Sequence, residues 1–160
     1  MAEKSIAELK KDYEKIQKKH GLPSFEELNI DFSIEKIAET ETEVLIREIR
    51  KYVGDKIGGY MRFLENLLNP VNAPMFIFSI IKLIESDEKK KLSEIYKELM
   101  KLEMKFIELD LDFNEQKEAL FIKQSFKEWQ GIKKEMLEIT EKINNRWDEK
   151  PEGNNKGYFG

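Results

Sequence analysis

Apolar side chains recur at helical spacing through the last third of the chain, from residue 114 to residue 147. Successive apolar positions are three or four residues apart, which is the spacing of one stripe along an α-helix. The stripe consists of Ile122, Phe126, Trp129, Ile132, Met136, Ile139, Ile143 and Trp147. A helix of roughly 34 residues is about 50 Å long, and a compact domain of this size does not need such a length. The pattern therefore predicts an elongated, coiled-coil-like bundle.

The same spacing predicts three further amphipathic helices, at residues 5–20, 41–68 and 86–109. The connection at residues 110–115 is short, so the last two helices are expected to be antiparallel neighbours. The first helix has a stripe only one residue wide, which predicts a loosely attached element. We therefore expect an all-α fold with one domain over residues 1–150. The glycine-rich residues 151–160 are expected to form a flexible tail.

Residues 75–84 form the longest apolar run and include Met75, Phe76, Phe78 and Ile81. A helix that is apolar nearly all round is usually buried. This favours a short helix enclosed between the second and third long helices. The alternative is an exposed groove or an oligomer contact, because so slender a bundle has difficulty covering every side of that helix.

Three glycines, Gly54, Gly58 and Gly59, interrupt the predicted helix at residues 41–68. Each glycine inside a helix costs roughly 0.5–1 kcal/mol relative to alanine. Either the helix kinks there, or another helix crosses close to the bare backbone. The apolar run at residues 75–84 is one candidate for that second helix.

Aromatic residues near the end of the chain are candidate partner contacts. Trp147 is at the end of the last stripe, where the other helices are expected to have ended, and Tyr158 and Phe159 are in the tail. A buried aromatic anchor contributes strongly to protein–protein affinity. Each of these residues also has a purely structural explanation. Trp147 would cover the end of the bundle, and Tyr158 and Phe159 would belong to a frayed terminus.

Composition excludes several classes of chemistry. The chain has no cysteine and a single histidine, His20, so thiolate metal sites, disulfides and sites needing two imidazoles are excluded within one chain. We assign no catalytic residue, no metal and no cofactor. The acidic cluster of Asp110, Asp112, Glu115 and Glu118 has oxygen ligands suited to a hard cation. Capping of the following helix is the favoured explanation for it.

Charge patterning leaves a second function open. Charged residues make up 38% of the chain and the net charge is −4, so no global positive field attracts nucleic acid. Lys10, Lys11, Lys18 and Lys19 are nevertheless candidate phosphate contacts on the first helix.

The abundance of lysine and glutamate is typical of proteins from hot-living organisms, and an AT-rich genome gives the same bias.

The leading functional hypothesis is therefore a non-enzymatic protein-interaction or assembly protein that acts through helical surfaces. Either a protein partner or a second copy of the chain would cover the surplus apolar surface. The alternatives are a nucleic-acid-associated factor and, third, a carboxylate metal-binding protein or enzyme. No signal peptide is evident and the longest apolar run is half a bilayer span. We therefore expect a cytoplasmic protein that does not contact a membrane.

Overall fold

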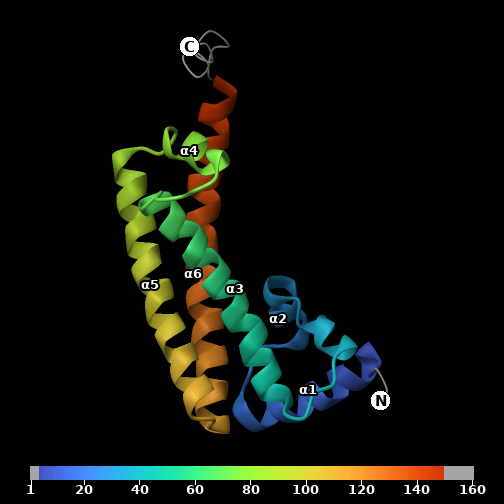
Figure 1. Cartoon of the computed structure of the whole chain (residues 1–160). Coiled ribbons are helices and arrows are strands. Elements are labelled where there is room, and N and C mark those ends of the chain that lie inside the picture. The colour runs from blue at the N-terminus through green and yellow to red at the C-terminus, as the bar shows by residue number, and fades with distance from the viewer. Residues whose placement is uncertain (1–3, 150–160) are drawn as a thin grey trace.

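The computed structural model describes residues 4–149, and over that range the chain is all-α, with no strand. The helices are α1 (Ile6–His20), α2 (Phe25–Phe32), the 3₁₀ helix η1 (Ile34–Glu39), α3 (Leu45–Leu68), α4 (Met75–Ile81), α5 (Ser86–Leu111) and α6 (Glu115–Glu149). Figure 1 shows α3, α5 and α6 as three long rods packed along one another. The predicted all-α fold is confirmed.

The core lies where the three long helices meet. Helix α3 packs on both α5 and α6, and α5 packs on α6. Val53 and Ile57 of α3, Leu99 of α5 and Ile122 of α6 are fully buried there. Burying a side chain of this size contributes about 1.5–3 kcal/mol, so the apolar stripes read from the sequence form the main source of stability.

The N-terminal helices start and stop at local signals. Ser5 accepts a hydrogen bond from the Glu8 amide while the Glu8 carboxylate accepts one from the Ser5 amide, and Ser24 and Glu27 repeat the arrangement. Such capping boxes satisfy amides that a helix start leaves unpaired. Gly21 ends α1 at φ 66°, in the left-handed region that favours glycine.

Helices α1, α2 and η1 form a small unit against α3 (Figure 1). Helix α1 buries two side chains, Leu9 and Tyr13. The Tyr13 hydroxyl donates a hydrogen bond to the Pro23 carbonyl, which fixes α1 to the start of α2. At the end of α1, Lys19 and His20 both contact the carboxylate of Glu115 in α6, at 3.0 Å.

Helix α4 is far more exposed than its composition predicted. It buries only Ile77 and Ile80, whereas Met75, Phe76 and Phe78 are 72, 63 and 42% exposed. The expectation that residues 75–84 are enclosed is therefore wrong. The physical reason is that α4 packs mainly on α3, and a seven-residue helix lying on a bundle can bury only one of its faces.

The helix that lies close to Gly54 and Gly58 of α3 is α5, not α4. A Cβ placed on Gly54 would lie 2.1 Å from the ring of Phe106, and one on Gly58 would lie 3.2 Å from Oε2 of Glu103. A Cβ placed on Gly59 would have no atom of another helix within 4 Å, so the close approach does not extend to it. Helix α3 runs as α-helix through all three glycines.

Candidate functional site

An apolar concave surface lies between the C-terminal parts of α3 and α6 and is closed at one end by α4. This α3–α6 groove has a volume of about 380 Å³. Its floor consists of buried side chains, including Leu64 of α3, Leu92 of α5 and Ile139 of α6. Within the described part of the chain, the groove has no charged lining residue, and its polar lining residues are Thr140 and Asn144.

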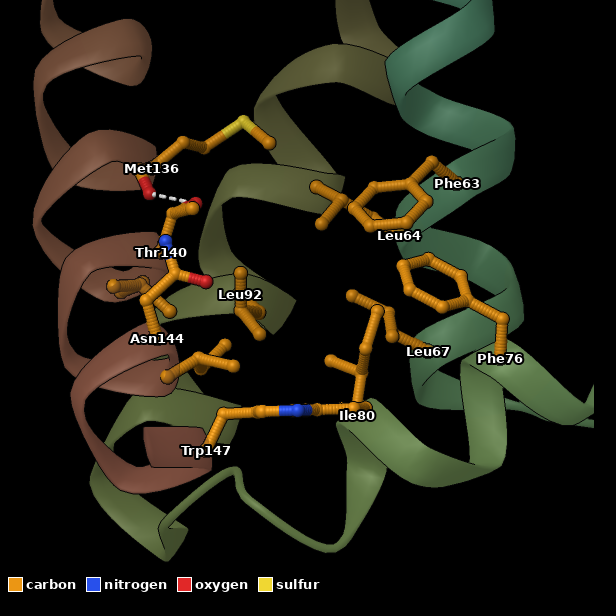
Figure 2. Close-up of a pocket in the computed structure, with 12 residues that line it drawn as sticks. Phe63, Leu64, Leu67, Phe76, Ile80, Leu92, Met136, Thr140, Asn144 and Trp147 are labelled. Atoms are coloured by element: carbon orange, nitrogen blue, oxygen red, sulfur yellow. Dashed lines mark hydrogen bonds between the residues drawn. The ribbon is translucent and has the colours of Figure 1, made fainter. Parts of the chain in front are cut away.

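The rim of the groove carries aromatic side chains, of which Phe76 and Trp147 are exposed. Figure 2 shows Phe63 of α3 and Phe76 of α4 on one wall, facing Met136 and Trp147 of α6 on the other. Trp147 is 49% exposed. The predicted interaction residues Phe76 and Trp147 are thus brought together at one site, although they are far apart in the sequence. Exposed apolar surface of this kind is characteristic of binding sites.

The other predicted contacts of α4 do not line this groove. Met75 and Phe78 are exposed beside it, and Ile81 is partly buried against the core on another face of α4. Tyr158 and Phe159 lie outside the described residues.

The C-terminal end of the chain's own helix α2 contacts the part of α6 that directly precedes the groove. The ring of Phe32 lies 6.3 Å from that of Trp129. Asp31 accepts hydrogen bonds from Gln130 and Lys133, each at 2.8 Å. Lys133 is about one helical turn before Met136, where the open groove begins. The surface that α2 covers on α6 therefore continues into the groove, where no other described segment covers it.

Arg146 holds the closed end of the groove together. Its Nη1 donates to the Leu83 carbonyl at 2.7 Å, and its Nη2 donates to Oε2 of Glu88 at 2.8 Å. The hydrogen bonds from Arg146 outweigh the effect of burial and hold the pKa of Glu88 below its ordinary value. The end of α6, the start of α5 and the segment after α4 are thus joined at one residue. Sequence reasoning missed Arg146, since nothing local marks its long-range partners.

The acidic cluster at the opposite end of the bundle links helices to one another. Asn114 caps α6, accepting a hydrogen bond from the Lys117 amide at 3.0 Å. Glu118 and Asp110 bind the guanidinium of Arg50, and Glu115 binds α1. Burial raises the pKa of Glu118, while Arg50 opposes the rise. Helix capping therefore does not account for the ion pairs that these carboxylates form with other helices.

The same region does not assemble a metal site within residues 4–149, where no group of three or more histidine or acidic side chains has suitable geometry. The candidate phosphate contacts are also partly engaged. Lys10 contacts Glu26 at 3.6 Å and Lys19 contacts Glu115, whereas Lys11 and Lys18 are exposed. Half of the candidate phosphate contacts thus already face a carboxylate.

Comparisons do not assign the site: no protein-family model, no curated protein and no solved structure matches this chain. None of the described helices is long and apolar enough to cross a bilayer.

Proposed function

We propose that this protein is a protein-interaction module that binds a short amphipathic helix of another protein in the α3–α6 groove. The observation that carries the proposal is the groove itself: an apolar floor with an exposed aromatic rim formed by Phe76 and Trp147. Helix-in-groove recognition uses apolar side chains at helical spacing to fill such a surface. Aromatic residues are also enriched in the cores of protein interfaces.

Helix α2 provides the pattern for the occupant. It is eight residues long and buries Phe25, Leu28 and Phe32, which are spaced by three and four residues. Its C-terminal end contacts α6 next to the open groove, where Phe32 packs on Trp129 and Asp31 binds Gln130 and Lys133. A partner helix with large apolar residues at that spacing would cover α6 in the groove as Phe32 covers Trp129.

The polar requirements of the groove differ from those of the surface under α2. Where α2 faces Lys133, the groove presents Thr140 and Asn144. The partner helix is therefore expected to place an uncharged polar side chain beside them, because an unpaired charge facing the groove would lose hydration without gaining a partner.

The proposal is tested by affinity capture from the source organism with matched variants. Phe76→Asp adds a charge to the groove rim, and Ile30→Asp adds the same charge on the exposed side of α2, where Ile30 is 78% exposed. A partner that is retained by the wild type and the Ile30 variant but lost from the Phe76 variant supports the proposal. If the Phe76→Asp variant retains the same partner as well as the wild type does, the proposal is overturned.

A second measurement locates the contact. Trp129 is buried and Trp147 is exposed, so acrylamide quenching reports mainly on Trp147. A synthetic helix from the captured partner should protect Trp147 from quenching, and Trp147→Phe should remove that signal. Native mass spectrometry that instead finds a small apolar molecule, displaced by Phe76→Asp, would assign the groove to a different class of ligand and refute the helix proposal.

A further inference from the structure

Helix α5 carries a second apolar stripe on its outward face. Four side chains on this helix are 38, 57, 43 and 83% exposed, in the order Met100, Met104, Ile107 and Leu111. They are separated by four, three and four residues, which is the spacing of a helix–helix seam. The side chains that α5 buries in the core lie on its other faces and include Ile95, Leu99, Leu102 and Leu109.

The stripe stays exposed in the described chain, and Met104 and Leu111 border grooves between α5 and α6. The main packing partners of α5 are α3 and α6, and Figure 1 shows α5 at the edge of the bundle, on the opposite side from α2. An exposed apolar seam about three turns long is a typical interaction surface. It is separate from the α3–α6 groove, so the two proposals can fail independently.

We propose that this stripe pairs with the same stripe of a second copy of the chain, in antiparallel orientation. In one register Met100 lies opposite Leu111 of the second copy, and Met104 lies opposite Ile107. This register covers all four exposed side chains at once, and sliding the copies by a full heptad leaves part of each stripe uncovered. A two-fold interface requires such a self-complementary surface.

Charges beside the stripe favour this orientation. Lys101 and Glu108 each follow a stripe residue and lie on the same flank of α5, and both are exposed. In the antiparallel register, Lys101 of each copy faces Glu108 of the other, which gives two attractive pairs. In a parallel pair with the copies in register, Glu103 would face Glu108, and both charges are negative.

The opposite flank carries Glu103 and Asp110, which would face each other across the antiparallel interface. Asp110 is already paired within its own chain, whereas Oε2 of Glu103 is buried without a hydrogen-bond partner. Asp110 binds Arg50 at 2.7 Å. The Glu103 carboxylate is turned towards Gly58 of α3, and burial raises its pKa. Repulsion on this flank is therefore reduced, while Lys101 and Glu108 remain available at the surface.

Engineered cysteines test the register, because the chain has no cysteine of its own. Met100→Cys and Leu111→Cys should form a disulfide-linked dimer when the two variants are mixed and oxidised. Neither variant should do so alone, since the two copies of position 100 would be about 16 Å apart along the helix axis. Cross-linking of each variant with itself would indicate a parallel pair and overturn the proposal.

Charge exchange tests the pairing in solution. Analytical ultracentrifugation should show a dimer of the wild-type chain and weaker dimers of Lys101→Glu and Glu108→Lys, on the order of 10-fold each, because two attractive pairs become repulsive. An equal mixture of the two variants should dimerise again.

Met104→Glu should give a folded monomer, and Leu137→Glu, a change at a similarly exposed position of α6, should leave the dimer intact. A wild-type monomer at millimolar concentration refutes the proposal.

Discussion

Arg50 and Glu118 form an ion pair in which neither side chain is exposed to solvent, with Nε of Arg50 2.7 Å from Oε2 of Glu118. The pair joins α3 to the first turns of α6 across 68 positions of sequence. The guanidinium also lies 4.8 Å from the ring of Phe106. Because Phe106 occupies the space left by Gly54, the ion pair and the glycine contact form one packed unit in the core.

Removing one member of this pair should be strongly destabilising. Arg50→Met leaves the Glu118 carboxylate buried without its partner, which typically costs about 3–5 kcal/mol. Urea denaturation measures the loss. The double variant Arg50→Met with Glu118→Leu should recover much of it, because no uncompensated charge remains; equal losses in the single and double variants would show that the pair itself contributes the stability.

Gly54→Ala and Gly59→Ala should have opposite effects on stability. The first places a methyl group 2.1 Å from the Phe106 ring, and overpacking of this kind typically costs about 1–3 kcal/mol. The second enters open space and should stabilise α3 by roughly 0.5–1 kcal/mol. Thermal melts of the two variants make the comparison, and a stabilising Gly54→Ala would contradict the described contact with α5.

Acid should weaken the closed end of the groove through Glu88. Its pKa in the folded protein lies below the ordinary value of 4.5, so its contribution to stability is complete above that value and is lost as the pH falls through the folded-state pKa. Glu88→Gln should therefore be less stable than the wild type at neutral pH, and the difference should narrow below pH 4.5. Denaturation at a series of pH values checks this, and a constant difference would count against it.

Asp31→Ala should loosen the N-terminal unit more than the three-helix core. Asp31 is buried and accepts hydrogen bonds from both Gln130 and Lys133, so its loss removes the polar link between α2 and α6. Hydrogen exchange should show protection in α1 and α2 reduced by about 1–3 kcal/mol, with α5 changed less. An equal reduction in every helix would mean that the N-terminal unit unfolds together with the bundle.

Much of the fold could be predicted because its signals are local. The three-and-four spacing of Ile122 to Ile143, and the capping residues Ser5 and Ser24, act within one or two helical turns. The exposure of Phe76 could not be predicted in the same way. An apolar run reports that a segment prefers to avoid water, and how many sides are covered depends on which helices lie beside it.

The candidate site was predictable only in part. Trp147 and Phe76 were singled out as separate candidates, and their meeting across one groove follows from how α4 lies on the bundle. Arg146 and Arg50 carried no sequence signal, since their partners lie 58 and 68 positions away.

The sequence by itself determined the helices, because helix formation depends on neighbours a few positions apart, and it determined that apolar surface would exceed what three slender helices can enclose. Tertiary structure alone decided where that surplus lies: in the groove beside α2 and along the outer face of α5. The physical reason is that burial depends on contacts between segments far apart in the chain, and these are fixed only when the helices pack.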